Sequence, residues 1–394
     1  MSNTAPGLRF PAGISNELFL RKYWQKRPLL MRAALPVDHF SLSAEELAGL
    51  ACESEIESRL IIEHGEGNWE LLHGPFGDAD FADLPETHWT LLVQDVDKFL
   101  PQVARLIDDF GFVPGWRIDD VMISFATDQG GVGPHTDAYD VFLMQAEGRR
   151  RWRISEKQYT DEDLLPDLEQ RILSNFETEQ EWILEPGDIL YLPPGVAHWG
   201  TAEGDCMTYS LGFRAPSQQE LASDWFQYLV AQSGDRRLGD PADLQSSDLA
   251  ALTAGVQDGA AQLLAQLPTT GSEDFQLWLG RFLTDPKPQF HIVPPDDEWN
   301  TADLADWLEQ GHGLSRHPFA RLAWARLPAD RLVLFYQGEN LLAPQSLGAA
   351  IRLIAEQRKI GNNGLIEIIK AVPAAAELLL QLINAGILEP AETP

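Results

Sequence analysis

The middle of the chain alternates apolar and polar residues in short runs, a pattern that predicts β-strands. The runs are Asp120–Phe125, Tyr139–Gln145, Glu181–Leu184, Ile189–Leu192 and Cys206–Phe213. Turn residues such as Glu185-Pro186-Gly187-Asp188 separate them. Several short strands at turn-marked spacing are typical of a β-barrel or jelly roll. We therefore predict a barrel over about residues 116–216.

Mixed elements precede this barrel and one insert interrupts it. The expected elements are helices beginning at Ser15 or Asn16 and at Ser43, strands over Ile56–Glu63 and Trp69–Leu72 with a turn at Glu66-Gly67-Asn68, and a helix over Val96–Phe110. Residues Asp161–Phe176 are polar and are predicted to form an insert over the mouth of the barrel.

The pattern after the barrel is helical, with apolar stripes that include Trp225, Leu249 and Leu263. Such stripes usually form a core, but no barrel face obviously needs them here, so a dimer interface is also an interpretation. Beyond the prolines at 286, 288, 294 and 295, a third set of elements is expected. These are a helix beginning at Asn300 or Thr301, strands over Phe319–Leu327 and Arg331–Tyr336, and helices over about 345–358, 362–370 and 373–386.

These elements predict a mixed α/β (α+β) fold with three parts. Residues 1–216 form a jelly-roll domain with an amino-terminal α/β extension, and residues 217–285 form a helical dimerisation region. Residues 286–394 form a winged-helix-like domain. Winged helices often bind DNA, but residues 291–394 carry 13 acidic and 8 basic side chains, so this module is expected to contact protein.

The charge of the whole chain also favours a protein partner over nucleic acid. Its 394 residues include 60 acidic and 29 basic side chains, a formal net charge of −31. Such a surface repels nucleic acid and anionic membranes and favours a basic partner, although solubility alone also explains it. The two cysteines, Cys52 and Cys206, make no disulfide framework, and no leader or long apolar run is present. We expect a soluble protein of the cytoplasm.

The strongest chemical signal is His135-Thr136-Asp137, which follows a glycine-rich turn. A histidine and a carboxylate two residues apart point the same way from one strand. They are two of the three ligands in the 2-His-1-carboxylate triad that holds non-haem Fe(II) and leaves positions open for O2 and a co-substrate. His198, after Pro193-Pro194-Gly195, is the candidate third ligand. The other histidines are expected to be structural or exposed: His39, His64, His73, His88, His291, His312 and His317.

The alternating pattern places Arg150 on the apolar face of its predicted strand rather than on the solvent-facing side. In the run from Arg149 to Ile154, Arg150 shares a face with Trp152 and Ile154, whereas its two arginine neighbours face the other way. A guanidinium on an apolar face needs an anion. That anion is either an internal carboxylate or, beside an iron triad, the distal carboxylate of 2-oxoglutarate. Ser124 faces inward on its predicted strand and either fills space or bonds the same co-substrate.

Several linked motifs resemble the bacterial ribosomal oxygenases, which are JmjC-type, 2-oxoglutarate-dependent hydroxylases. The motifs are Tyr23–Pro28, Trp116–Asp120, Met122–Phe125, Gly133–Asp137, Tyr139–Phe142, Gly148–Trp152, Glu185–Pro194 and Gly212–Pro216. The resemblance implies a 2-oxoglutarate contact at Ser124, a homodimer, and 3-hydroxylation of an arginine. The implied substrate is the sixteenth protein of the large ribosomal subunit.

Residues near these motifs suggest how a basic substrate is held. Acidic side chains are expected to attract it, and Tyr139 or Met122 to pack its methylene groups, although all are equally consistent with solvated loops. The acidic candidates are Asp119, Asp120, Asp128 and Asp140. Three other functions remain open at this point: a cupin-type metal enzyme that does not use 2-oxoglutarate, a non-catalytic acidic protein-binding module, and a lysine demethylase.

Overall fold

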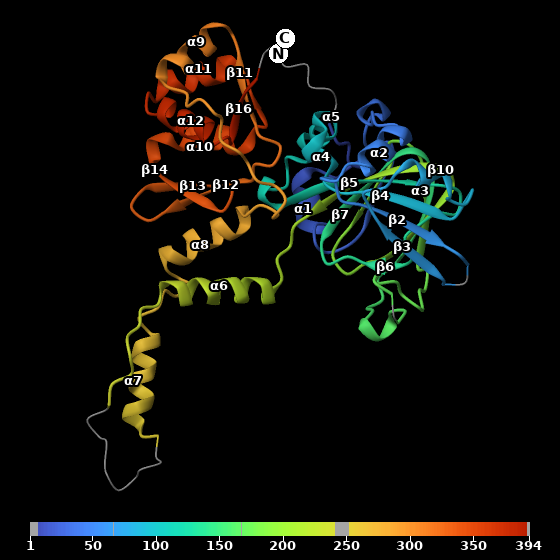
Figure 1. Cartoon of the computed structure of the whole chain (residues 1–394), viewed down its shortest axis with the longest axis horizontal. Helices are drawn as coiled ribbons and strands as arrows, with labels where there is room; N and C mark the ends of the chain where they lie inside the picture. Colours follow the sequence, from blue (N-terminus) through green and yellow to red (C-terminus); the bar gives the residue numbers. More distant parts are fainter. Residues whose placement is uncertain (1–6, 66, 167, 241–251, 392–394) are drawn as a thin grey trace. The chain divides into compact units, whose positions relative to one another are not determined.

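The computed structural model describes residues 7–65, 67–166, 168–240 and 252–391 (Figure 1). The chain divides into two compact units, Met1–Ala215 and Pro216–Pro394. The predicted end of the jelly-roll domain at residue 216 lies next to this division, whereas the further division at residue 285 stays a prediction. Glu66 of the predicted turn and Leu249 of the predicted stripe lie outside the described residues.

Ten of the described strands form one antiparallel sheet in the first unit, and this sheet supplies the predicted barrel. The strands are β1 (Leu29–Met31), β2 (Ser58–Glu63), β3 (Trp69–His73), β4 (Trp89–Val93), β5 (Ile118–Ala126), β6 (His135–Thr136), β7 (Asp140–Ser155), β8 (Gln180–Leu184), β9 (Ile189–Leu192) and β10 (Ala197–Phe213). Their order is β1-β9-β7-β10-β5-β4-β2-β3, with β6 paired to β10 and β8 paired to β7. The predicted strands are therefore present, and the chain also forms β1 and β4, which were not predicted.

The two longest strands, β7 and β10, pair along most of their length and bend together. Their register is irregular between Glu203 and Thr208, which is the signature of a β-bulge. Gly148 lies across from this bulge with φ +63°, and a Cβ there would come within 2.1 Å of the Asp205 carbonyl oxygen. Only glycine fits this turn. The bend allows each strand to carry inward-facing residues at widely separated levels of the barrel.

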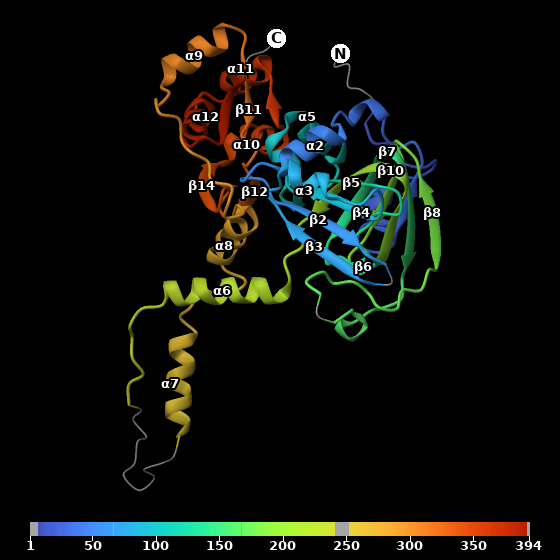
Figure 2. The same ribbon diagram turned by 45° about the vertical axis from the view of Figure 1, so that its right-hand side comes forward.

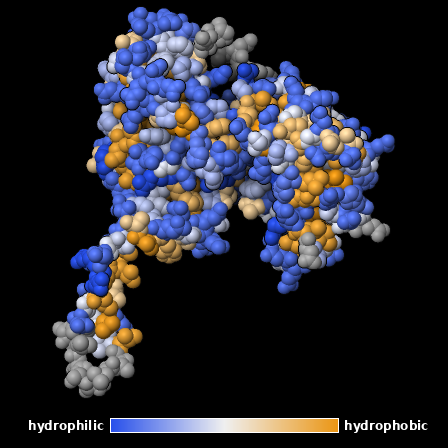
Figure 3. Space-filling view, in the orientation of Figure 1, coloured by the Kyte–Doolittle hydropathy of each residue, from blue (hydrophilic) through white to orange (hydrophobic). Residues whose placement is uncertain are grey.

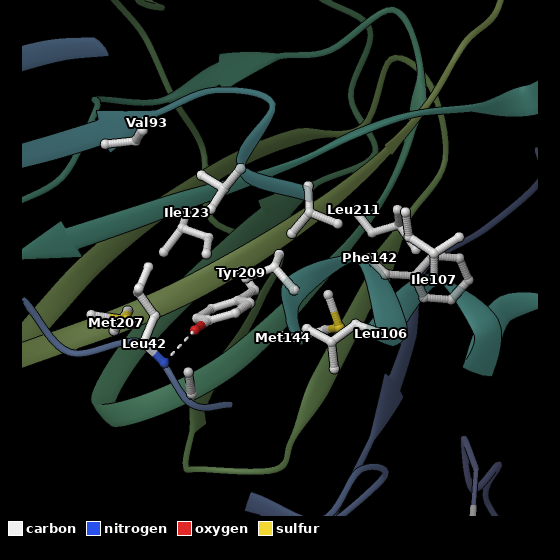
Figure 4. Packing of buried hydrophobic residues seen from close by; sticks show 14 of the residues in the cluster. Leu42, Val93, Leu106, Ile107, Ile123, Phe142, Met144, Met207, Tyr209 and Leu211 are labelled. Carbon is white, nitrogen blue, oxygen red and sulfur yellow. Dashed lines mark hydrogen bonds between the residues drawn. The ribbon is translucent and has the colours of Figure 1, made fainter. Parts of the chain in front are cut away.

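A large apolar core covers the outer face of these strands (Figure 4). Ile123 of β5, Phe142 and Met144 of β7 and Tyr209 of β10 are fully or almost fully buried there. The Tyr209 hydroxyl accepts a hydrogen bond from the Leu42 amide at 3.3 Å, which ties the amino-terminal segment to the barrel. Because strand residues alternate faces, the residues between these core positions point into the barrel.

Short helices complete the first unit. They are α1 (Asn16–Lys22), α2 (Ala44–Ala51), α3 (Asp78–Ala82), α4 (Val96–Phe99) and α5 (Pro101–Ala104), with 3₁₀ turns at Val37–His39, Arg105–Phe110, Gly115–Arg117 and Asp161–Asp163. The predicted caps Ser15 and Ser43 both accept amide hydrogen bonds, and Ser43 forms the predicted capping box with Glu46. The single helix predicted over Val96–Phe110 is wrong. Leu100 is extended because it precedes Pro101, and the helix breaks there.

The predicted insert packs against the turn that leads into the metal motif. The Leu173 amide donates to the Pro134 carbonyl at 2.7 Å. The Ile172 side chain fills the space beside Gly133, where a Cβ would meet it at 3.0 Å. Figure 2 shows the insert, in green, beside β6. The insert therefore braces the segment that carries His135.

The second unit contains seven described helices and two small antiparallel sheets. The helices are α6 (Gln218–Gln232), α7 (Ala254–Leu264), α8 (Glu273–Thr284), α9 (Thr301–Glu309), α10 (Gly348–Glu356), α11 (Asn362–Ala371) and α12 (Ala375–Asn384), with a 3₁₀ turn at Gln345–Leu347. The strands are β11 (Gly313–Arg316), β12 (Leu322–Leu327), β13 (Arg331–Tyr336), β14 (Glu339–Pro344), β15 (Lys359–Ile360) and β16 (Leu388–Ala391). They pair as β15-β11-β16 and β12-β13-β14.

The sequence anticipated most of these elements but not all strands. Asn300 caps α9 as predicted, and β12 and β13 match the two predicted strands closely. Strands β11, β14, β15 and β16 were not predicted. Helix α8 packs on the β12–β14 sheet at Gly280, where a Cβ would lie 2.2 Å from the Phe335 ring. Among the described helices, none is long and apolar enough to cross a membrane.

Candidate metal centre

Three predicted ligands come together where β6 pairs with β10. His135 and His198 are direct cross-strand partners, and their ring centroids lie 4.2 Å apart. Strand β6 ends at Thr136, so Asp137 lies just beyond the strand rather than within it. Its carboxylate oxygens lie 3.9 Å from Nε2 of His135 and 3.6 Å from Nε2 of His198. One donor atom from each residue falls within 4.8 Å of the others.

Backbone contacts orient both imidazoles towards the carboxylate. Nδ1 of His135 bonds the Gly133 carbonyl and Nδ1 of His198 bonds the Val196 carbonyl, both at 3.0 Å. Each contact places the ring proton on Nδ1 and leaves the Nε2 lone pair free for a metal. Burial, and secondarily the neighbouring His135, lowers the pKa of His198 to about 4, which keeps it in the neutral form that coordinates metals. The donor set fits a 2-His-1-carboxylate site for Fe(II).

Arg150 is buried on the inner face of β7, as its phase predicted. Only 2% of its surface is exposed, and burial lowers the pKa of its guanidinium. The neighbouring arginines face outward and pair with glutamates, as in the 3.0 Å contact between Arg153 and Glu181. No carboxylate among the described residues pairs with Arg150, so the internal salt bridge considered from the sequence is not present in that part of the chain.

The groups around Arg150 are neutral. Its Nη1 donates to Ser124 Oγ at 3.3 Å and to Thr208 Oγ1 at 3.4 Å, and its Nη2 donates to the Gly200 carbonyl at 3.5 Å. Its Nε has no acceptor among the described atoms. A buried cation without a counter-ion is unstable by several kcal/mol. The arrangement therefore favours an anionic ligand at this point.

Trp152 connects the buried cation to the metal ligands. Arg150 lies over its ring with Cζ 5.1 Å from the centroid, and the His198 ring lies 5.8 Å away. The inner surface thus carries the three metal donors and, next to Trp152, a guanidinium that pairs with no carboxylate among the described residues. A small dianion with a carboxylate at each end can contact both, and 2-oxoglutarate has that chemistry.

Two of the predicted substrate contacts, Tyr139 and Asp120, lie beside the position that a Cβ would take at Gly212. Tyr139 is 43% exposed, and its ring lies against Gly212, where a Cβ would meet it at 3.8 Å. The Asp120 carboxylate flanks the same glycine at 3.5 Å. Met122 follows Asp120 by two residues on the same face of β5, and it packs against a buried cluster that includes Ile172 of the insert.

The other acidic candidates lie in different surroundings. Asp128 accepts a hydrogen bond from the Gly204 amide at 2.7 Å on an exposed turn, and this bond lowers its pKa. Asp140 is fully buried and accepts bonds from Arg117 at 2.9 Å and from Tyr191 at 2.6 Å. The suggestion that Asp140 attracts substrate from solvent is therefore wrong, because its charge is already neutralised inside the fold.

The structure adds inner residues that the sequence did not single out. Thr208 and Gln145 are buried to 1% and 0% exposure beside Arg150. Gly200 matters because a Cβ there would lie 2.7 Å from the Trp152 ring and 2.8 Å from Nε of Arg150. The sequence contained one signal for Thr208 and Gln145, because each is a polar residue between core residues on a predicted strand.

Comparisons with known proteins agree with this geometry. Family models match the JmjC domain over residues 105–221, the ROXA-like winged helix over residues 254–389, and the AraC-like ligand binding domain over residues 174–277. The ribosomal protein uL16 3-hydroxylase of Escherichia coli K12 is 39% identical over 372 residues, which cover 93% of this chain and 95% of that relative. A probable ribosomal oxygenase of Haemophilus influenzae is 35% identical over 65% of this chain and 64% of its own length.

The chain belongs to the ribosomal oxygenases, a family with a JmjC domain. An X-ray structure of YcfD from Escherichia coli matches it with a TM-score of 0.81 at 34% identity, over 97% of this chain and 100% of that one. YcfD in complex with cobalt and 2-oxoglutarate matches with a TM-score of 0.78 at 33% identity, over 97% and 99% of the two chains. Membership in this family confirms the predicted mixed α/β class, with a jelly roll followed by a winged helix.

Proposed function

We propose that this protein is a 2-oxoglutarate- and Fe(II)-dependent hydroxylase that adds a hydroxyl group to carbon 3 of an arginine in ribosomal protein uL16. The observation that carries this proposal is the convergence of His135, Asp137 and His198 together with a buried Arg150 that pairs with no carboxylate among the described residues. In the overall reaction one atom of O2 enters succinate and the other enters the arginine, while 2-oxoglutarate loses CO2.

The residues divide into two groups. His135, Asp137 and His198 hold the iron, and Arg150 with Ser124 binds the distal carboxylate of 2-oxoglutarate. Bound iron supplies the redox chemistry that couples decarboxylation of 2-oxoglutarate to hydroxylation. The protein positions the co-substrate and excludes water, because Arg150, Ser124 and His198 are each less than 5% exposed.

The substrate follows from the relative and from the surface. The Escherichia coli relative is named for 3-hydroxylation of uL16, and a basic ribosomal protein suits a chain with a formal charge of −31. Met122 and Tyr139 pack against the arginine methylene groups. Asp128 adds negative charge on an exposed turn. Asp120, whose Oδ2 accepts a hydrogen bond from the Asp95 amide at 3.0 Å, adds negative charge near Tyr139.

The test is a reaction of purified protein with uL16, Fe(II), 2-oxoglutarate and O2. We expect succinate to form and one arginine peptide to gain the mass of a single oxygen atom in tandem mass spectrometry. Arg150→Ala should raise the 2-oxoglutarate concentration required, whereas uL16 with lysine at the modified position should remain unmodified. In a deletion strain, the same peptide should lack the added oxygen.

Two outcomes would overturn the proposal. Succinate formation without any oxidised uL16 peptide would remove the substrate. A protein that binds metal but neither binds nor consumes 2-oxoglutarate would instead be a cupin-type enzyme of another class. A non-catalytic protein-binding module would have no need of metal, so loss of metal binding on mutation of Asp137 separates it from both enzymes.

The protein is further proposed to act as a homodimer in the cytoplasm without binding nucleic acid directly. Support for the dimer comes from exposed apolar side chains on α6 and α7: Phe226 at 63%, Val230 at 72% and Leu264 at 67%. Figure 3 shows apolar residues along this part of the surface. Isolated apolar residues are common, but a contiguous exposed set marks an interaction site. Cytoplasmic location is supported by the ribosomal substrate.

Light scattering tests the dimer directly. Val230→Glu should convert a dimer to a monomer, because the substitution places a charge in an apolar contact. Leu342→Glu is the matched control, since Leu342 is 50% exposed on β14 and outside the helical region. A monomer in the unmodified protein, or equal masses for Val230→Glu and wild type, would contradict this interface.

A further inference from the structure

A chain of buried hydrogen bonds begins at Nη1 of Arg150. Thr208 Oγ1 accepts from Nη1 of Arg150 at 3.4 Å and donates to Oε1 of Gln145 at 3.2 Å. Nε2 of Gln145 donates in turn to the Glu147 carbonyl at 2.8 Å, which fixes the direction of its amide. Thr208 and Gln145 are opposite each other on β10 and β7, so the backbone ladder holds both in place.

The direction of each proton in this chain follows from the groups involved. A threonine hydroxyl has one proton, and Gln145 Oε1 can only accept. The Thr208 proton therefore points to Gln145, and its oxygen lone pairs face the guanidinium. The hydroxyl acts as an acceptor with a fixed direction and does not turn to compete with Arg150 as a donor.

The hydrogen-bond inventory of Arg150 shows what this fixed acceptor achieves. A guanidinium has five N–H groups. Both Nη1 hydrogens are used by Ser124 and Thr208, and one Nη2 hydrogen points to the Gly200 carbonyl. Nε has no acceptor among the described atoms, and Nη2 makes a single bond, to the Gly200 carbonyl. An incoming carboxylate therefore meets Nε and Nη2, while both Nη1 hydrogens are already bonded to Ser124 and Thr208.

We propose that Thr208, held by Gln145, is a positioning residue that orients Arg150 for the distal carboxylate of 2-oxoglutarate. This inference rests on the proposed function, because it assigns that carboxylate to Arg150. Arginine has a long side chain with considerable rotational freedom. Fixing one end of its guanidinium before the co-substrate arrives reduces the ordering required on binding. Thr208 therefore affects the affinity for 2-oxoglutarate without touching it.

A purely structural role for Thr208 makes a different prediction. A buried hydroxyl that only satisfies neighbouring groups affects the free energy of unfolding and leaves ligand affinity unchanged. Thr90 supplies a matched control for that case. It is fully buried on β4, and its hydroxyl donates to the Gly131 carbonyl at 3.2 Å, but it has no contact with Arg150.

The experiment measures 2-oxoglutarate binding by calorimetry to the Mn(II)-loaded protein, so that no turnover is needed. Thr208→Val should weaken binding about tenfold, as expected for loss of one hydrogen bond to a charged group. Thr208→Ser should restore it, and Gln145→Leu should weaken it in the same direction. The Thr208→Val/Gln145→Leu double variant should be less than additive, because both act through Arg150. Thr90→Val should unfold earlier but bind 2-oxoglutarate as wild type does.

Kinetics provide a second readout. The KM for 2-oxoglutarate should rise in Thr208→Val, while the KM for uL16 and the affinity for Mn(II) should stay within about twofold of wild type. If Thr208→Val does not fold, Thr208→Ala and Gln145→Leu carry the same test. Wild-type affinity in the folded Thr208 and Gln145 variants would overturn the inference. Failure of the unmodified protein to bind 2-oxoglutarate would instead overturn the proposed function.

Discussion

The described residues around Arg150 leave its positive charge uncompensated unless a ligand binds. Arg150 is 2% exposed, its neighbours are neutral, and its Nε has no acceptor among the described atoms. Burial therefore costs hydration free energy that these contacts do not fully offset. Most of that penalty is removed when a carboxylate arrives, because the ion pair then forms in a region of low polarity. The buried conformation of Arg150 is therefore stabilised when an anion binds to it.

Gly200 gives a sharp test of the space beside Arg150. In Gly200→Ala, the new methyl group would press on Nε of Arg150 and on the Trp152 ring, with separations of 2.8 and 2.7 Å. We expect affinity for 2-oxoglutarate to fall by at least about tenfold, with Mn(II) affinity retained. Calorimetry on the Mn(II)-loaded protein measures both. Gly49→Ala is the control, since nothing lies within 4 Å of a Cβ there. Unchanged 2-oxoglutarate affinity in Gly200→Ala would place the co-substrate elsewhere.

Asp137 is the ligand whose loss should separate metal binding from folding. Asp137→Ala removes the only carboxylate of the three-residue donor set, so we expect loss of Mn(II) binding by electron paramagnetic resonance and loss of all succinate formation. Its thermal unfolding should stay close to that of wild type, because the side chain is partly exposed. Asp161→Ala, at an exposed site, should leave both measurements unchanged. Full activity in Asp137→Ala would refute the metal assignment.

At the scale of elements, the strands β7 and β10 organise the site. Strand β10 carries His198 near its start and Thr208 beyond its bulge, and β7 carries Gln145 and Arg150 on either side of Gly148. The pairing of the two strands holds these four inward-facing side chains at fixed positions along the barrel, and none of the four is carried by a loop. Sites built on paired strands hold their geometry more tightly than sites built on loops.

Sequence patterns identified His135, Asp137, His198 and Arg150, but the alignment of the strands that brings them together could not be read from the chain. The phase of Arg150 and the spacing of His135 and Asp137 depend on local alternation, which is readable from the chain. The cross-strand pairing of His135 with His198 depends on register, which is set by distant partners. Gln145 and Thr208 were missed although each is a polar residue between core residues on a predicted strand, because their pairing with each other depends on the same register.

Local rules also explain the errors outside the site. For the helix predicted over Val96–Phe110, Pro101 left the start open, since proline fits best in a first turn. The structure ends α4 at Phe99 and begins α5 at Pro101, because Leu100 is extended before the proline. Strand β4 was missed although Leu91 and Val93 are almost completely buried in the core. Its apolar run continues on both faces and therefore lacks the alternation of a half-buried strand. The short strands of the second unit, such as β15 with two residues, are defined by their partners.

The contact between α8 and the β12–β14 sheet yields a stability prediction. A Cβ at Gly280 would lie 2.2 to 2.3 Å from atoms of the Phe335 ring. Gly280→Ala should therefore destabilise the second unit by about 1–3 kcal/mol, as expected for overpacking, despite the better helix propensity of alanine. Chemical denaturation followed by circular dichroism measures the change. The double variant Gly280→Ala/Phe335→Leu should recover part of the loss; a more stable Gly280→Ala protein would contradict this packing.

At the scale of the whole molecule, net charge governs the encounter with substrate. A formal charge of −31 attracts a basic protein and repels the dianion 2-oxoglutarate, and salt weakens both effects. Raising NaCl from about 50 mM to about 500 mM should therefore increase the KM for uL16 severalfold and should not increase the KM for 2-oxoglutarate. Steady-state kinetics with each substrate varied in turn measures the two responses. A KM for uL16 that does not depend on salt would show that the acidic surface serves solubility alone.

The bulge between Glu203 and Thr208 has a consequence for how this barrel tolerates changes in length. His198 precedes the bulge and Thr208 follows it on the same strand. Deleting a single residue from the intervening turn would leave the metal ligands in place but turn every later side chain of β10 to the opposite face. Thr208 would then enter the apolar core, and Tyr209 would leave it. Homologous chains should therefore vary this turn by two residues at a time, or restore the phase with a second bulge.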